Sequence, residues 1–411
     1  MSTAVTPSFV MQYERDMRVI NENAYMGMLA DENAWFARVA RPFQSFRKTD
    51  RITWFLNNAM IRPIGPTGAG GMDFQSLVTQ TVEYPSFKHG VGIKVQVDQL
   101  EDLDGTGLNE LATWSKDVGV QTAYYPQQLG SMAILNGANT DGSATTYDGL
   151  PFFMDNTAAT GNPSGDAAYS NGHYYNPYQP PLGGYYNWLH GAAVPATANT
   201  VTGHQFYPGA LPIDDSVTAD IALQNLGKAI AYTMSIKQAN GVQPRFLKVA
   251  YIIAPPRMAP RLRLLMNANE LALAAAGGAG SADVKAVIAG FGLGTPIIAS
   301  EFGSNFSFTM PMPFSQANLV GNTTGNITYL NETATGNDTT YYIVMTENRT
   351  TQLGGLLHVK RKPFAIRYFG EGGQSVLDAM LSRSDEIEYQ CKGRMAVQLG
   401  HPFAIFRFDG S

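Results

Sequence analysis

Residues 91–105, VGIKVQVDQLEDLDG, decide the fold prediction. Four branched apolar residues alternate with glycine and polar residues here, and they are Val91, Ile93, Val95 and Val97. Strict alternation predicts a half-buried strand. After Gly105 the apolar spacing becomes helical, which predicts a helix over about 109–135 with Pro126 inside it. Such a helix would be roughly 40 Å long at ~1.5 Å per residue.

Between the strand and the helix lies an acidic cluster formed by Asp98, Glu101, Asp102 and Asp104. An EF-hand calcium loop needs an oxygen ligand at its first position and a glutamate at its twelfth. Aligned on Gly105, those positions are Leu100 and Leu111, so the match fails. We interpret the acids as a structural corner that favours the positive N-terminal end of the helix.

The composition describes a globular, loop-rich chain with few charges. It has 411 residues, of which 44% are hydrophobic and 15% charged, with 42 Gly and 23 Pro. About 25% charged residues is usual for soluble domains. A weakly charged surface favours burial against partners. The net charge of −5 argues against a dedicated nucleic-acid binder, which would normally carry a basic face.

No feature of the sequence predicts a leader, a membrane span or a disulfide framework. The N-terminus lacks a basic region followed by an apolar stretch. No window approaches 18 uninterrupted apolar residues, and Cys391 is the only cysteine. We therefore expect a protein that folds in a cytoplasm without a membrane segment.

The first 90 residues predict an arm followed by an extended loop. Residues 1–50 mix short helical runs with scattered charge, and Pro42 interrupts them, so we interpret them as an arm lying on another surface. Strand-like stretches at 52–62 and 74–83 flank a tip rich in glycine and proline at 63–71. That tip is too long for a tight turn, which predicts an extended two-stranded excursion.

Residues 156–213 form a segment of different composition, with Asp166 as their only charged residue. Their aromatic residues include Tyr174, Tyr175, Tyr178, Tyr185, Tyr186 and Trp188. Disordered linkers normally lack such aromatic content. We expect an ordered, irregular insertion whose aromatics pack locally or against a neighbour, with sugar stacking as the alternative.

The remaining chain alternates helices and strands. A helix capped by Asp215 or Ser216 runs towards Gly241, a strand follows at 246–254, and a second helix is predicted at 255–274. Further strands are predicted at 295–300, 341–346, 364–370, 386–391 and 401–408.

The search for a catalytic or cofactor site returns no candidate. The histidines show neither HxxxH nor HExxH spacing, and no GxSxG pattern is present. The glycine clusters at 65–71 and 290–294 lack a phosphate-loop pattern. Cys391 falls on the apolar face of a strand, which favours a buried structural thiol. We predict a protein that is not an enzyme, holds no cofactor or metal, and assembles with itself.

Several segments, in this order, resemble the major head subunit family of Mu-like phages. The acidic turn DQLED at 98–102, Pro126 with Leu129, and DGLPFF at 148–153 carry the resemblance. Further similar segments are VAYIIAPPRMAPRLRLLM at 249–266, HVKRKPFAIRYFG at 358–370 and KGRMAVQLGHPFAIFRF at 392–408. The similarity covers 45–155 and 215–411, whereas 156–213 is foreign to the family.

The resemblance implies an α+β fold of the Hong Kong 97 capsid type. Its first parts would be an N-terminal arm (1–50), an extended β-hairpin loop (51–90) and a peripheral domain with a long spine helix (91–150). These would be followed by an insertion (151–214), an axial domain with part of the peripheral domain (215–350) and the C-terminal strands of the peripheral domain (351–411).

The function so implied is that of a major capsid protein. It would form hexamers and pentamers of an icosahedral shell around the double-stranded DNA of a tailed phage, without sequence-specific binding. The alternatives are an encapsulin-like compartment of the same fold, or a carbohydrate-binding surface protein that uses the insertion. Expected partners are the chain itself, a separate scaffold protein, a portal and a decoration protein, and the expected location is the virion, after assembly in the host cytoplasm.

A separate scaffold is expected because 1–50 is too short and too weakly charged to contain a scaffolding segment. The residues predicted to contact other subunits are Arg62, Pro63, Gly65, Pro66, Gly68, Tyr185, Tyr186 and Trp188.

Overall fold

The computed structural model describes residues 7–31, 34–47, 49–55, 79–96, 106–138, 146, 150–154, 173–174, 184–190, 209–238, 244–267, 270–275, 278–283, 296–312, 330–347, 354–368 and 386–410. The chain divides into two units. Unit 1 comprises 1–50, 84–130 and 358–398, and unit 2 comprises 51–83, 131–357 and 399–411. Both contain helices and strands, which confirms the α+β class.

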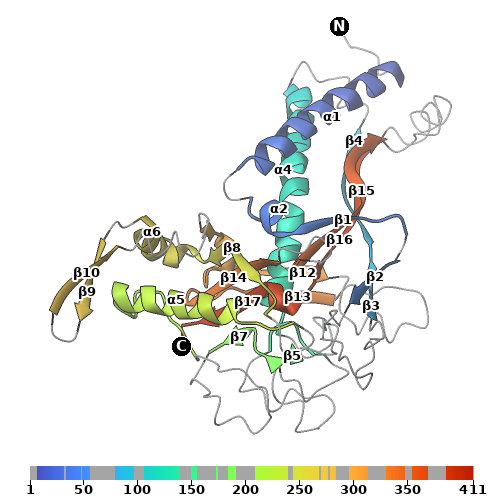
Figure 1. The fold of residues 1–411 in the computed structure, drawn as a ribbon. Helices are drawn as coiled ribbons and strands as arrows, with labels where there is room; N and C mark the ends of the chain where they lie inside the picture. The colour runs from blue at the N-terminus through green and yellow to red at the C-terminus, as the bar shows by residue number, and fades with distance from the viewer. Residues whose placement is uncertain are drawn as a thin grey trace, which may run out of the picture. The chain divides into compact units, whose positions relative to one another are not determined.

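Unit 1 is built on a four-stranded sheet of order β1-β15-β16-β4 (Figure 1). Its strands are β1 (Arg41–Gln44), β4 (Phe87–Gln96), β15 (Leu356–Tyr368) and β16 (Glu386–Leu399). Its helices are α1 (Pro7–Leu29), α2 (Phe36–Val39) and α4 (Thr106–Leu135). One core joins both long helices to the sheet, and its buried members are Met17, Val95, Leu111, Val118, Ile366, Ile387, Tyr389 and Cys391.

The predicted strand and long helix are both present. The strand begins earlier than expected, at Phe87, and the helix runs from Thr106 through Pro126 to Leu135. Val95 is buried, but Val91 is 47% exposed, so only part of the alternating face reaches the core. Residues 97–105 lie outside the described part of the chain, and the role of their acids stays a prediction.

The N-terminal segment contains one continuous helix instead of short runs. In α1, Met17 is buried, and the Ser115 hydroxyl on α4 donates to the Met17 carbonyl at 2.6 Å. Asn21 Nδ2 donates in turn to the Ser115 carbonyl at 3.2 Å. The described part of the arm thus packs on its own chain, and contact with another subunit stays a prediction. The buried polar residues Glu14 and Asn21 obscure the helical periodicity in the sequence.

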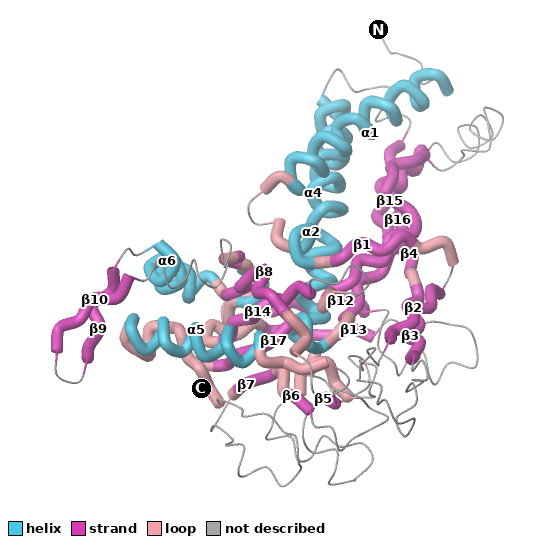
Figure 2. The backbone as a smooth tube through the Cα atoms, viewed as in Figure 1, coloured by secondary structure: helices cyan, strands magenta, loops and turns pink. Residues whose placement is uncertain are grey.

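Unit 2 is built on a five-stranded sheet of order β11-β8-β14-β17-β7. The strands are β7 (Trp188–Leu189), β8 (Leu247–Ala254), β11 (Ile297–Ile298), β14 (Thr340–Glu347) and β17 (Ile405–Asp409). The central strand β14 is antiparallel to β8 and β17, whereas the outer strands pair in parallel with their neighbours. Figure 2 shows α5 (Ala219–Met234) running beside this sheet. Its apolar side chains Ala222, Leu226, Ala229 and Ile230 belong to the same core as the sheet.

Shorter elements complete the chain. The helix α6 (Ala259–Asn267) follows the 3-10 turn η4 (Pro256–Met258), and further 3-10 turns are η5 (Ser300–Phe302) and η6 (Pro402–Ala404). Two-stranded sheets are β2 (Thr49–Phe55) with β3 (Thr79–Pro85), β5 (His173–Tyr174) with β6 (Gly184–Tyr185), β9 (Glu270–Ala275) with β10 (Gly278–Asp283), and β12 (Ser307–Met312) with β13 (Leu330–Thr335). The strands predicted to flank the 63–71 tip therefore pair, while the tip lies outside the described residues.

Two boundary predictions were wrong. The helix predicted over 255–274 ends at Asn267, because the sequence after it pairs as β9 with β10, and tertiary pairing overrides helix propensity there. The helix predicted from Asp215 begins at Ala219, since Asp214 accepts a bond from the Ser216 amide in a preceding turn. Residues 399–411 belong to unit 2, in which β17 pairs with β14, and the assignment of 351–411 to a peripheral domain stays a prediction.

Candidate interaction surfaces

Of the predicted subunit contacts, Arg62, Pro63, Gly65, Pro66 and Gly68 lie outside the described residues. The other three are described, and each packs inside unit 2. Tyr185 and Tyr186 are 2% and 5% exposed, and both belong to the unit 2 core. Contact with other subunits stays a prediction, but nearly all the side-chain surface of these two tyrosines is already buried in their own chain.

The insertion is fastened to the sheet by specific polar contacts. The Tyr186 amide donates to the Tyr232 hydroxyl at 3.1 Å, and that hydroxyl donates to the Tyr186 carbonyl at 2.9 Å. Trp188 Nε1 donates to Asp409 Oδ2 at 2.6 Å, and the Arg407 guanidinium lies 4.1 Å from the Trp188 ring centre. Since β7 also pairs with β17, this part of the insertion belongs to the sheet. Buried tyrosines do not offer a flat exposed surface for stacking sugars.

Cys391 and the described histidines occupy structural positions. Cys391 is fully buried, and burial raises the pKa of its thiol to about 11. His89 Nδ1 lies 2.9 Å from the Tyr125 hydroxyl, and His173 Nε2 lies 2.9 Å from the Phe152 carbonyl oxygen. Burial, with Lys360 adding to it, lowers the pKa of His358 to about 3. Packing and hydrogen bonding therefore account for the positions of Cys391, His89, His173 and His358.

Two general searches give no site among the described residues. No group of three or more His, Cys, Asp or Glu side chains is gathered there that could hold a metal ion. None of the helices within this part of the chain is long and apolar enough to cross a membrane.

The surface of each unit exposes large apolar side chains. On α1 of unit 1, Val19 is 56% and Met26 64% exposed, and Phe46 beyond β1 is 82% exposed. In unit 2, Phe246 is 62% exposed and has a positive φ of 58°, which is rare for a bulky residue. Clusters of exposed apolar residues mark interaction surfaces more often than single ones do. The α1 pair is the candidate of this kind.

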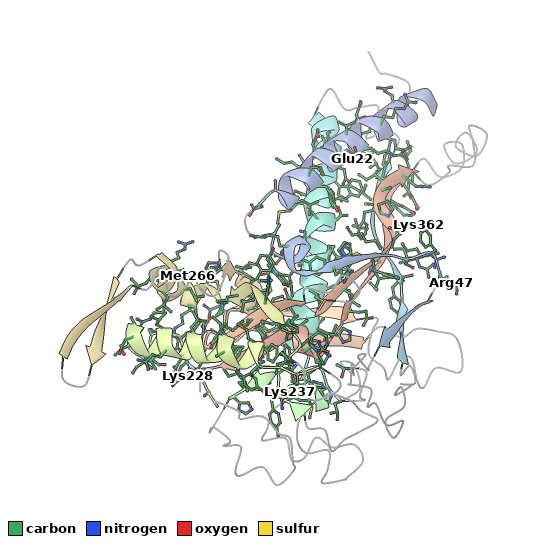
Figure 3. All side chains as sticks on the ribbon, in the orientation of Figure 1. Glu22, Arg47, Lys228, Lys237, Met266 and Lys362 are labelled. Carbon is green, nitrogen blue, oxygen red and sulfur yellow. The ribbon has the colours of Figure 1, made fainter. Side chains whose placement is uncertain are left out.

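A cleft of about 850 Å³ opens on the sheet of unit 1. Its cationic lining residues come from three neighbouring strands, and they are Lys88, Arg361, Lys362, Arg367, Lys392 and Arg394. No carboxylate is among the residues described as lining it. Figure 3 labels Lys362 on β15. This cleft was not predicted from the sequence. Several of its cations are nevertheless clustered there, within the run Lys360, Arg361, Lys362 and in the alternation of Lys392 with Arg394.

No protein-family model and no curated protein matches this sequence. Solved structures with similar folds include a capsid of the cyanophage P-SCSP1u, at 11% identity and a TM-score of 0.44, covering 90% of this chain and 85% of that one. A virus-like particle from Pyrococcus furiosus is similar at 9% identity and a TM-score of 0.42, covering 97% and 100%. The mature capsid of bacteriophage PhiM1 is similar at 11% identity and a TM-score of 0.41, covering 90% and 84%.

The described elements follow one another in the order that the resemblance found in the sequence implies. A helix in the N-terminal segment precedes two paired strands, a further strand and a 30-residue helix. The long strands β15 and β16 then return to the strand before that helix, while a second sheet with its own helices forms unit 2.

Proposed function

We propose that this chain is the major capsid protein of a tailed phage, a subunit that assembles into hexamers and pentamers of an icosahedral shell around double-stranded DNA. The observation that carries the proposal is the order of elements along the chain up to and including α4, together with the sheet on which α4 packs. The long helix α4 packs on a sheet of long strands and is preceded by a paired excursion, β2 with β3. This is the layout that the resemblance to Mu-like head subunits implies.

The physical logic of a shell supports the same function. A closed shell repeats head-to-tail contacts around its rings, so each subunit needs surfaces that reach its neighbours. The paired strands β2 and β3, with the tip predicted at 63–71, would supply such a reach, and the exposed Val19 and Met26 would supply apolar contact area. Weak contacts become strong when many act together in one lattice.

The proposed partners and location follow from this role. A separate scaffold protein, a portal and a decoration protein would act on the assembling shell, and the subunit would be found in the virion after assembly in the host cytoplasm. DNA would be enclosed without sequence-specific contacts. The subunit itself would catalyse no reaction.

Deleting the tip at 63–71 tests the proposal. The deletion should leave a folded subunit with a nearly unchanged circular dichroism spectrum, because the sequence predicts a loop tip rich in glycine and proline there and not a helix, strand or apolar core segment. It should abolish closed particles, as judged by light scattering and electron microscopy. The exposed substitution Lys228→Gln on α5 is the control and should assemble normally. Normal particles from the deletion variant would count against the proposed contact and the shell assignment.

A further inference from the structure

We propose that the basic cleft on the unit 1 sheet binds the phosphate backbone of nucleic acid. This inference rests on the proposed function, because a shell that encloses DNA brings that polyanion to the subunit. It revises the expectation, drawn from the net charge of −5, that the chain lacks the basic face of a dedicated nucleic-acid binder.

Positive and negative side chains are separated along the sheet of unit 1. At one end of β4, Lys94 is neutralised by Glu388 at 2.8 Å and by Glu386 at 3.5 Å. At the other end, Arg394 stands opposite Lys88, and Lys392 stands opposite Gly90. Lys88 and Lys392 make no ion pair with any residue that the structure describes. The sheet therefore carries paired carboxylates at one end and cations without a direct ion pair at the other, although Lys392 still interacts electrostatically with Glu388 on the same strand.

Guanidinium groups are crowded in the basic cleft. Arg394 Nε donates to both the carbonyl and the hydroxyl of Ser86 at 3.1 Å, which fixes the side chain in place. Burial and the nearby charge of Arg361 lower the pKa of Arg394. Arg361 Nη1 is itself buried and has no hydrogen-bond partner in the described structure. A buried donor without an acceptor is costly, and an anionic oxygen would satisfy it.

The floor of the basic cleft contains several small residues. Five of the lining residues between the cations are small, namely Gly90, Gly92, Gly393, Pro363 and Ala365, and the remaining three are His89, Val91 and Gln390. A Cβ on Gly90 would lie 2.9 Å from Lys392 Cγ, so the glycine leaves room for the lysine stem to lie across β4. Side chains here would lift a ligand off the sheet, whereas the small residues let it approach the cations.

The extent of the cleft fits a duplex backbone. Arg361 and Arg367 are separated along β15 by about 20 Å at ~3.3 Å per residue. Duplex DNA carries one negative charge per ~1.7 Å of its axis, so several phosphates face a surface of this length. Its six cations outnumber the two neutral polar side chains described in the lining, His89 and Gln390, so contacts would be made mainly to phosphates and not to base edges. Binding should therefore be independent of sequence.

The test measures the affinity of unassembled full-length subunits for a labelled duplex of arbitrary sequence, by fluorescence anisotropy over a range of salt concentrations. Lys88→Gln with Lys392→Gln removes two charges and keeps most of each side-chain stem. If both lysines contact phosphates, the slope of log affinity against log salt should shrink by about 2, since each contact contributes about 0.9. The control is Lys116→Gln with Lys228→Gln, two exposed lysines outside the cleft, and it should leave the slope unchanged.

Three results would overturn the inference: no duplex binding by the wild-type chain at low salt, equal slopes for the cleft and control variants, or tighter binding of polyglutamate than of duplex at the same salt. The last result would identify an acidic protein as the occupant. Equal thermal unfolding midpoints for all variants would show that folding is intact. Electron microscopy of the same proteins separates the two proposals: shells without cleft-dependent DNA binding refute only the inference, and absence of wild-type shells refutes the proposed function.

Discussion

At the scale of single residues, the packing of α1 on α4 depends on Gly119. A Cβ at this position would lie 2.5 Å from the Asn21 carbonyl oxygen and 2.8 Å from the Ala24 Cβ. Gly119→Ala should therefore lower the free energy of unfolding by about 1–3 kcal/mol, reduced by the ~1 kcal/mol that alanine gains in a helix. Guanidinium unfolding followed by circular dichroism measures the change.

The matched control is Gly27→Ala on α1, where a Cβ would meet nothing within 4 Å. Only the helix propensity changes there, so this variant should be more stable by about 0.5–1 kcal/mol. If both alanines stabilise the protein equally, the close approach of the two helices at Gly119 is absent.

A second residue-scale prediction concerns pH. Burial holds the pKa of His358 at about 3 in the folded protein, and its ring lies 5.2 Å from that of Phe36. The unfolded chain binds the proton near its ordinary pKa of ~6.5, so stability is full above that pH. It should fall by up to about 1.4 kcal/mol per pH unit as the pH drops from about 6.5 towards 3.

His358→Phe tests this directly, because it keeps an aromatic ring against Phe36 and removes the titrating group. Comparing unfolding free energies at pH 7 and pH 5 cancels the contributions of other groups. The variant should lose less stability than the wild type on acidification, and equal losses would show that His358 does not remain neutral in the fold.

At the scale of elements, α1 has two faces with different roles. Met17 and Asn21 are buried towards α4, whereas Val19 and Met26, seven residues apart and so on one side of the helix, are 56% and 64% exposed. Val19→Ser with Met26→Ser should leave the unfolding free energy within about 0.5 kcal/mol per site. It should lower the fraction of protein in assemblies several-fold, as measured by analytical ultracentrifugation.

The control for the outer face is Arg15→Ser with Asn23→Ser, which changes two exposed polar positions of the same helix. Assembly should be unaffected. Equal assembly by the apolar and polar variants would show that α1 makes no contact between subunits.

Elements with one dominant local signal were predictable from the sequence. The alternation around 91–97 and the helical spacing after 105 predicted β4 and α4 to within a few residues. The prediction failed where distant partners decide. Residues 270–275, predicted as helix, form a strand that pairs with β10. Tyr185 and Tyr186 read as surface aromatics, but they are buried in a core assembled from distant segments.

At the scale of the whole molecule, positively charged side chains are concentrated in one place although the chain as a whole is negative. A net charge of −5 says little about a surface on which six cations from β4, β15 and β16 line one cleft. The sequence alone could not predict that Lys88 lies opposite Arg394. Their pairing depends on the register of two antiparallel strands, β4 and β16, whose paired residues are more than 300 positions apart in the chain. The composition predicted a globular, loop-rich protein, but the basic cleft is formed only when β4, β15 and β16 pair in one sheet.

The most direct test of the central claim is negative-stain electron microscopy of the full-length chain, expressed alone and together with its native neighbouring proteins. The proposal predicts rings, tubes or closed shells of uniform diameter, in which the chain is the main component. A protein that stays a 44.5 kDa monomer under every condition, scaffold included, would contradict it.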